Sequence, residues 1–548
     1  MTSTSSHYAG PGGRPASATS AWRAGKRSQA ARLAAGGAAV AALALGGVQA
    51  AGAVPVTAVG CGATDLANAI NSATSGETLS LQNGCTYDLT SGLTAAVSLN
   101  IQGNGDTIEP AAGSPAMTML TFADSTTDSV SQLTMTHGNG GAPTGTFADD
   151  GGAIVNYGTL TITGSTFRDN RAIGGSRPSG SAGAILNIGT LSVDRSNFSG
   201  NDAATTAGGA IDTYGGPVTL TNSTFTDNQA VISGGALYSD NAVVTVTNCD
   251  FLHNSGDAIA MDGSSGRPLS VTGGEFIGNQ ATGPGAVGGA IESFVDTPTT
   301  VRHALFQDNS ATAWGGAIYA YEDSPLTVSD SRFVHNTAGQ YGGAIYTDDD
   351  SPLTLTGGVL TDNSAGKDGG GVAVFDGSTG AATSVKDATF LDNTVTAAGG
   401  WGGAIYIGVV VPNSSLSVNH SSFTGNGAPR GEGGAIWTDA LTTKVSRSGF
   451  SRNYANSGGA LFNQDSGGGA ALTVTGSQVQ ENHAQVRGGG LDNGSGATLD
   501  LDHTQVTVNQ AGTAGGGIYN AGTATLTSSP VFGNFPDNCA PHGSVPGC

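Results

Sequence analysis

Short segments in which apolar and polar residues alternate recur along most of this chain. In residues 218–221, Val218 and Leu220 share one face and two threonines share the other. Alternation with a period of two predicts a β-strand with one buried face. The same apolar pair recurs at Leu160/Ile162, Leu191/Val193, Val244/Val246, Leu269/Val271, Leu326/Val328, Leu353/Leu355, Leu416/Val418, Leu472/Val474 and Leu499/Leu501. Strands this short cannot bury a face alone, so we expect them to assemble into a larger sheet.

Two tetrapeptides repeat beside these strands. Gly-Gly-Ala followed by Ile or Leu begins at Gly151, Gly208, Gly234, Gly288, Gly315, Gly342, Gly402, Gly433 and Gly458. Phe-x-x-Asn ends at Asn170, Asn201, Asn228, Asn254, Asn279, Asn309, Asn336, Asn393, Asn426 and Asn453, with degenerate copies at Asn363, Asn482, Asn509 and Asn534. Successive Asn positions lie 25 to 33 residues apart. A repeat of this length is typical of a solenoid, in which each coil pairs with its neighbours.

Residues 208–228 indicate how one repeat builds one coil. The Gly pair opens a strand after a bend, a second strand contains Val218 and Leu220, and Phe225 points inward. We expect Asn228 to take the next bend, because asparagine tolerates the left-handed conformation and its amide can bind the backbone. Parallel pairing follows, because the chain always travels the same way around. We therefore predict an all-β fold: a single-stranded right-handed parallel β-helix of about 17 coils with a short N-terminal capping helix.

The sequence divides into five segments. They are a signal peptide (1–53), a cap helix and first coil (54–92), irregular early coils (93–150), the repeats (151–534) and a C-terminal disulfide cap (535–548). We expect the helix to begin after Thr64 as its N-cap and to stop at Gly76, with Leu66 and Ile70 on its apolar face. A helix placed there covers the open sheet edge of the first coil.

Residues 1–53 have the features of a secretory signal. Basic residues precede the apolar run Leu33–Val48, which is too short for a comfortable membrane span. Small residues favour cleavage after Ala53, with Ala50 as the second choice. We therefore expect a secreted, extracellular protein whose mature chain crosses no membrane; the alternative is an uncleaved anchor.

The charge balance narrows the possible partners. The 548-residue chain has 19 Lys and Arg against 41 Asp and Glu, a formal net charge of −22. Such a chain repels nucleic acid and anionic membrane surfaces, so neither is an expected partner.

The five cysteines fit an oxidising compartment. Cys61 and Cys85 flank the first structural element, and Cys539 and Cys548 close the last, so we predict two disulfides that staple the ends of the domain. Cys249 replaces the small residue two positions before Phe251, so we expect it to be buried and inert. A reactive thiol is the alternative.

The two tetrapeptides resemble the repeats of the chlamydial polymorphic outer-membrane proteins, over about residues 150–534. The preceding segment, with Gly76-Glu77-Thr78-Leu79-Ser80-Leu81, also resembles the entry to pectate-lyase-type β-helices. The resemblance implies an exported β-helix with a role in adhesion. Members of that family end in a membrane β-barrel, whereas this sequence ends at Cys548, so we do not expect anchoring by that route.

Candidate chemistry lies at the positions that the repeat leaves variable. Near the middle of the chain, aromatic residues fall four positions after the first Gly of a pair, or just before it, and carboxylates follow six to eight positions after that Gly. The aromatic and acidic candidates for ligand binding are Trp314, Tyr319, Tyr321, Tyr341, Tyr346, Asp376, Trp401, Tyr406 and Trp437. Rings flanked by acids can stack on sugars and accept hydrogen bonds from their hydroxyl groups. Alternatively, the rings stack on one another and stabilise the coils.

These residues lead to two hypotheses about function. The first is an extracellular binding, adhesion or scaffolding module for a polysaccharide or another cell-surface ligand. The second is a polysaccharide lyase or glycoside hydrolase whose acids are Glu322, Asp323, Asp348, Asp349 and Asp350. No cofactor is expected, although Asp348, Asp349 and Asp350 could bind Ca²⁺. The alternative is that these acids are turn residues, which keep the rod soluble.

Overall fold

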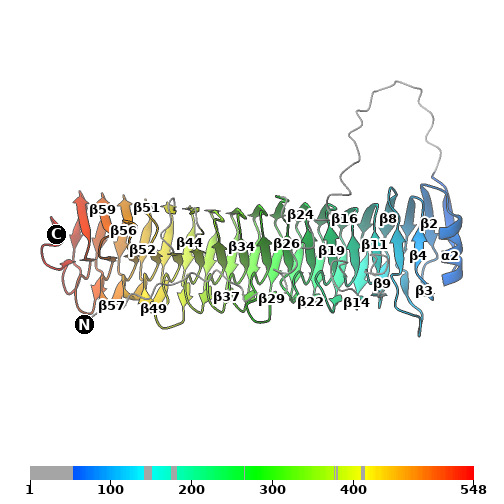
Figure 1. Cartoon of the computed structure of the whole chain (residues 1–548), viewed down its shortest axis with the longest axis horizontal. Helices are drawn as coiled ribbons and strands as arrows, with labels where there is room; N and C mark the ends of the chain where they lie inside the picture. Colours follow the sequence, from blue (N-terminus) through cyan, green and yellow to red (C-terminus); the bar gives the residue numbers. More distant parts are fainter. Residues whose placement is uncertain are drawn as a thin grey trace, which may run out of the picture.

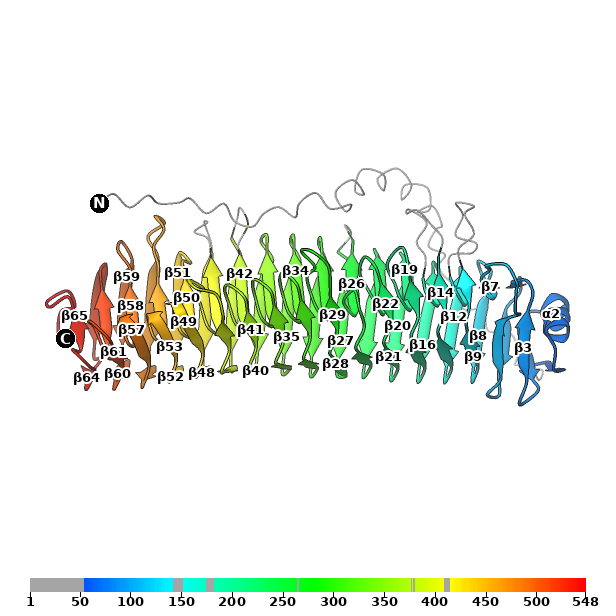
Figure 2. The same ribbon diagram turned by 90° about the horizontal axis from the view of Figure 1, so that it is seen from below.

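The computed structural model describes residues 54–140, 151–173, 182–263, 266–375, 377, 380–408 and 414–548. These residues form one elongated rod, in which short strands stack along the long axis (Figure 1). Helix α2 (Ala63–Ser72) covers one end of the rod, and the chain terminus Cys548 lies at the other (Figure 2). The predicted signal peptide and Asp376 lie outside the described residues.

Each coil contributes a strand to each of up to four parallel sheets. In residues 211–230 the strands are β19 (Ile211–Tyr214) in sheet C, β20 (Val218–Thr221) in sheet A, β21 (Thr224–Thr226) in sheet B and β22 (Gln229–Ala230) in sheet D. The next coil repeats the pattern with β23 (Leu237–Asp240), β24 (Val244–Thr247) and β25 (Asp250–Leu252). Equivalent strands pair in parallel register, with Val218 opposite Val244, for example. Sheet A has 18 strands within the described residues, so the predicted parallel β-helix is confirmed.

The core runs along the inside of the coils. The predicted strand pairs face inward, as Val218 and Leu220 show, and the phenylalanines of sheet B form a continuous stack. Phe225 lies 4.8 Å from Phe198 and 4.9 Å from Phe251 between ring centroids, with nearly parallel planes. From Phe167 to Phe333, and again from Phe390 to Phe450, a buried aromatic ring in each coil therefore adds both apolar area and ring stacking to the contact between coils.

The repeated asparagines form a second internal ladder. The Asn228 side chain is fully buried, and its Nδ2 donates to the carbonyl of Phe198 and to Asn254 Oδ1, both at 3.0 Å. The expectation that Asn228 itself takes the left-handed bend is wrong. The preceding residue, Asp227, has a φ of 54°, because the asparagine must point inward to reach its partners while its exposed neighbour makes the turn.

The two glycines of each pair have different tasks. Gly208 has a φ of +75°, a conformation that favours glycine. A Cβ on Gly209 would lie 2.1 Å from the carbonyl oxygen of Gly235 in the next coil. The first glycine therefore permits the bend, and the second allows two coils to approach closely.

The N-terminal helix begins slightly earlier than predicted. Helix α2 spans Ala63–Ser72, Gly62 is at its N-cap position, and no side chain caps it. The expectation that Thr64 is the N-cap is therefore wrong, since Thr64 lies inside the helix. Leu66 and Ile70 are buried as expected, so the apolar face of the helix packs on the first coil.

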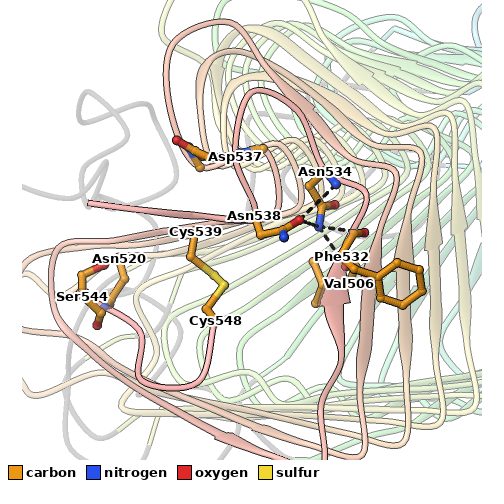
Figure 3. Close-up of a disulfide and its surroundings, with 11 residues drawn as sticks. Val506, Asn520, Phe532, Asn534, Asp537, Asn538, Cys539, Ser544 and Cys548 are labelled. Atoms are coloured by element: carbon orange, nitrogen blue, oxygen red, sulfur yellow. Dashed lines mark hydrogen bonds between the residues drawn. A yellow bond between two sulfur atoms is a disulfide. The ribbon is translucent and has the colours of Figure 1, made fainter. Parts of the chain in front are cut away.

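Disulfides fasten both ends, in the predicted pairings Cys61–Cys85 and Cys539–Cys548. At the C-terminal end the asparagine ladder finishes with Asn534, whose Nδ2 lies 3.2 Å from Asn538 Oδ1 (Figure 3). Cys249 is free and fully buried, and burial raises the pKa of its thiol to about 11. The thiol is therefore held in its unreactive form.

Candidate functional site

The predicted aromatic residues gather on the outer face of sheet C. Residues that follow the inward Ile of each strand, such as Tyr319 in β34 (Ile318–Tyr321) and Tyr346 in β38 (Ile345–Asp348), point away from the core. Tyr319 and Tyr346 are paired in register. Residues that precede the Gly pair also align from coil to coil, as Trp314 does with Tyr341. The structure therefore brings the two predicted rows together.

The rings pack against one another rather than lining an open groove. The centroid of Trp314 lies 6.0 Å from that of Tyr319 and 5.7 Å from that of Tyr346. Trp401 and Trp437 are stacked at 5.0 Å. Their exposed fractions are small: 0% for Tyr346, 1% for Tyr319, 5% for Tyr406 and Trp437, 7% for Tyr341 and 8% for Trp314. These rings form a second apolar layer outside sheet C, and most ring faces are covered.

Two of the predicted aromatic residues remain half-buried. Tyr321 and Trp401 pack at opposite edges of the layer, because Tyr321 ends β34 whereas Trp401 precedes a Gly pair three coils further along. Tyr321 lies just before the acidic turn at Glu322 and Asp323. The accessible part of the predicted surface next to the acids is therefore the edge at Tyr321.

The predicted acids occupy consecutive turns beside that edge. Tyr346 donates its hydroxyl to Asp348 Oδ2 at 2.8 Å, and the amide of Asp349 donates to Asp348 Oδ1 at the same distance. Burial raises the pKa of Asp348 to about 6. Burial, together with the nearby charges of Glu322 and Asp350, also raises the pKa of Asp349. The cluster can hold a proton near neutral pH.

The same acids also stabilise the turns themselves. Glu322, Asp323, Asp349 and Asp350 all have positive φ. The amide of Asp323 donates to the carbonyl of Asp349 at 3.1 Å, and Asp350 Oδ1 accepts from the amide of Gly380 at 2.9 Å. Within the part of the chain that the structure describes, no group of three or more His, Cys, Asp or Glu is arranged to hold a metal ion. Of the candidate Ca²⁺ ligands, Asp348 ends β38, and Asp349 and Asp350 form the turn that follows.

The sequence analysis missed three carboxylates in the aromatic layer, of which Asp368 and Asp492 are buried and Glu432 is half-buried. Asp368 accepts from the amide of Trp401 at 2.8 Å, and burial raises its pKa to about 7. Glu432 accepts from Trp437 Nε1 at 3.3 Å, and burial raises its pKa. Asp492 Oδ2 accepts from Arg487 Nε at 2.7 Å. The available signal was their repeat position, since Asp368 and Glu432 occupy the position before the Gly pair that Trp314 and Tyr341 occupy in other coils.

Two surface hollows lie on a different part of the rod. One, of about 450 Å³, is lined by residues of the corner between sheets A and B, among them Glu275, His303 and Arg332. The other, of about 390 Å³, lies at the same corner further along, beside Asp387 and His420. Neither is lined by the predicted aromatic or acidic residues, so these hollows do not provide a cleft for them.

Comparisons with known proteins agree with this architecture. Residues 143–295 match the model of the right-handed β-helix region, which confirms the predicted handedness. Residues 303–321 and 330–348 match the Chlamydia polymorphic membrane protein repeat. No curated protein and no solved structure was found to match the chain. Among the described residues, no helix is long and apolar enough to cross a membrane.

Proposed function

We propose that this chain is an exported, rod-shaped binding and scaffolding module, with a cell-surface or extracellular polysaccharide as its ligand. The observation that carries the proposal is the rod itself. The Phe stack and the Asn ladder bind every coil to the next, so residues at outward positions are held on a rigid frame. A rigid surface loses little conformational entropy when it binds a long ligand.

The edge of the aromatic layer at Tyr321, together with Trp401 at the opposite edge three coils further along, is the part of the outer face of sheet C that best suits a sugar. Both rings are partly exposed, and Glu322 and Asp349 lie beside Tyr321 in the same and the next coil. An exposed ring can stack on a sugar face, while a neighbouring carboxylate accepts hydrogen bonds from its hydroxyl groups. The buried rings hold this edge in place.

Binding to a panel of soluble and insoluble polysaccharides tests this function. The double variant Tyr321→Ala, Trp401→Ala is expected to lose binding, because both stacking rings are removed. Tyr454→Ala is the matched control, because Tyr454 is 38% exposed and lies on sheet D. Absence of binding to any glycan by the unaltered chain, or equal loss in the control, would contradict the proposed ligand and leave a structural rod.

A polysaccharide lyase or glycoside hydrolase is the second candidate function. It is favoured by Asp348, whose raised pKa of about 6 means that its carboxyl, beside Asp349, is protonated in mildly acidic solution. Enzymes of this kind use one protonated and one ionised acid. Release of reducing ends or unsaturated products that is abolished by Asp349→Asn, but kept by Asp227→Asn, would establish the enzyme. Binding without any product would exclude it for the substrates tested.

A further inference from the structure

The outer face of sheet A carries an uninterrupted row of hydroxyl groups. The strands concerned are β8 (Thr127–Ser131), β12 (Thr159–Thr163), β16 (Thr190–Asp194), β20, β24, β27 (Leu269–Thr272), β31 (Thr299–Arg302), β35 (Leu326–Ser329), β39 (Leu353–Thr356), β43 (Ala382–Lys386) and β47 (Ser415–Asn419). They follow one another along the rod (Figure 2). Their central outward residues pair in register and all are Ser or Thr: Ser129, Thr161, Ser192, Thr219, Thr245, Ser270, Thr300, Thr327, Thr354, Ser384 and Ser417. We call this set the hydroxyl row.

The hydroxyl row is presented to solvent. From Thr161 to Ser417 each residue is at least partly exposed, and none of these hydroxyls hydrogen-bonds to another described residue. The serines at the neighbouring corner behave differently. Ser223 Oγ, for example, accepts from the amide of Ser196 at 3.1 Å and donates to the carbonyl of Thr221 at 2.7 Å. The corner hydroxyls stabilise the fold, whereas the hydroxyl row is available to a partner.

A second outward row widens the surface in the central coils. Two residues along from Thr219, Thr245 and Thr354 lie Thr221, Thr247 and Thr356, so each of these coils presents Thr-x-Thr. Asp194, Arg302 and Lys386 are the charged residues of this second row between β16 and β43. Strand geometry places hydroxyls roughly 4.8 Å apart between coils and roughly 6.6 Å apart along a strand. Where both rows carry Ser or Thr, the result is a regular array of hydroxyl and methyl groups, in which the Thr221 hydroxyl donates to Asp194 Oδ1 at 3.0 Å.

Strand propensity alone does not account for this composition. Threonine suits any exposed strand position, so propensity would favour it equally on sheets A and B. In the coils from β25 to β36 (Arg332–Val334), however, the outward residues of sheet B include Asp250, Glu275, Leu305 and Arg332. Sheet A of the same coils has Arg302 as its one charged outward residue and no charge in its hydroxyl row, although the chain carries a net charge of −22. In these coils the two faces therefore differ in chemistry, not in secondary structure.

We propose that the outer face of sheet A binds the surface of ice. The partner must be uncharged, because the hydroxyl row from Ser129 to Ser417 offers no ion pair. It must also be periodic in two dimensions, because the surface repeats its hydroxyls in two directions. The water lattice on the side faces of hexagonal ice has rectangular repeats similar to those of the strand lattice. The core holds the rows rigid, and threonine side chains have few rotamers. Ordered water can therefore bind many hydroxyls at once, and little side-chain entropy is lost.

Partitioning of the full chain into slowly growing ice, combined with ice recrystallisation, tests this proposal. The unaltered chain is expected to enter the ice and to slow recrystallisation. Thr245→Lys is expected to lose most of both effects, because a long charged side chain lifts the face from the lattice. Leu252→Lys is the matched control, because Leu252 is an outward residue of sheet B in the same coil.

The outcomes separate this proposal from the polysaccharide ligand proposed above. Exclusion of the unaltered chain from ice would overturn the inference, and so would equal loss in Thr245→Lys and Leu252→Lys. Binding of a neutral glycan that Thr245→Lys abolishes, without any effect on ice, would also overturn it. Circular dichroism and the melting temperature show whether each variant is folded. If Thr245→Lys does not fold, Thr327→Tyr tests the same row in another coil.

Discussion

At the residue scale, each coil turns at exposed residues with positive φ. Asn222, His303 and Asp330 adopt this conformation at the corner between sheets A and B, and Asp227 and His335 adopt it next to the ladder asparagines. The residues that bend vary from coil to coil and are mostly polar, with Val508 an apolar exception, whereas the repeated residues point inward. The repeated Asn of the Phe-x-x-Asn motif therefore marks the hydrogen-bonding residue of each coil. The residue with positive φ is the one before it, and its identity changes from coil to coil.

Removing one ladder asparagine tests the weight of these hydrogen bonds. Asn309 Nδ2 donates to the carbonyl of Phe276 at 2.8 Å and to Asn336 Oδ1 at 2.9 Å, and its Oδ1 accepts from Asn279. Asn309→Ala leaves buried polar groups unpaired, so we expect a loss of roughly 2–4 kcal/mol. Chemical denaturation measures the loss. Asn197→Ala, at an exposed position of β17 (Asn197–Ser199), should be nearly neutral, and an equal effect there would contradict the role of the ladder.

Asp368 makes stability depend on pH. Burial raises its pKa from the unfolded value of 3.8 to about 7, so the folded state binds the proton more tightly. This contribution is therefore complete below about pH 4 and is lost as pH rises through about 7. Asp368→Asn keeps an acceptor for the Trp401 amide without a charge. We expect it to raise stability at pH 8 by on the order of 2 kcal/mol and to flatten the decline.

Thermal melts between pH 4 and pH 8 measure this effect. Asp227→Asn, which removes one exposed carboxylate, is the control and should leave the shape of the pH profile unchanged. A profile for Asp368→Asn parallel to that of the unaltered chain would show that this carboxyl is not the titrating group.

At the scale of elements, each strand of sheet B places one inward side chain at the same position in its coil. Phe306 stacks on Phe276 at 4.7 Å and on Phe333 at 4.8 Å, but the following coil has Leu360 in the same register. The stack resumes with Phe390. Sheet B therefore accepts leucine where volume is kept, and the ring interaction adds to the packing without being indispensable in every coil.

Two substitutions at Phe306 separate volume from ring stacking. Phe306→Leu resembles the natural break at Leu360 and is expected to cost about 1 kcal/mol. Phe306→Ala leaves a cavity next to two rings and is expected to cost roughly 3–5 kcal/mol. The two midpoints of denaturation give the comparison. Equal costs would mean that ring contacts, rather than filled volume, dominate the stack.

The outer face of sheet C shows the limit of reading elements from sequence. Alternation correctly placed Tyr319 and Tyr346 on the face opposite to the core. An outward direction does not by itself mean exposure. Trp314 and Tyr341, which precede the Gly pairs, pack over the outward ring of Tyr346. The buried Asp368 and the half-buried Glu432 belong to the same layer. Only the path of the connections between coils decides which outward side chains reach solvent.

At the scale of the whole molecule, the rod is a stack of nearest-neighbour contacts closed at both ends. In such a stack the terminal coils have a neighbour on one side, so they are the first to fray. Helix α2 with Cys61–Cys85 protects one end, and Cys539–Cys548 protects the other. The last coil is also held by Asn520, whose Nδ2 donates to the carbonyl of Ser544 at 2.7 Å.

Loss of the C-terminal disulfide should therefore act locally. In the variant Cys539→Ser, Cys548→Ser we expect faster amide exchange in β62 (Ile518–Asn520), with unchanged exchange in β39, and a loss of roughly 2 kcal/mol in the terminal unit. Hydrogen exchange with mass spectrometry resolves the two regions. Cys249→Ser is the control, since serine fills this corner position in other coils. Faster exchange throughout the rod would contradict local fraying.

The sequence by itself determined the repeat, the strands, the inward residues and the disulfide pairs of this protein. These features depend on local periodicity and on the ends of a linear stack, and both are visible in one dimension. The tertiary structure decided which outward residues are accessible. It covered most of the aromatic rows of sheet C and left the hydroxyl row of sheet A open, because exposure depends on how the turns between coils fold over a face.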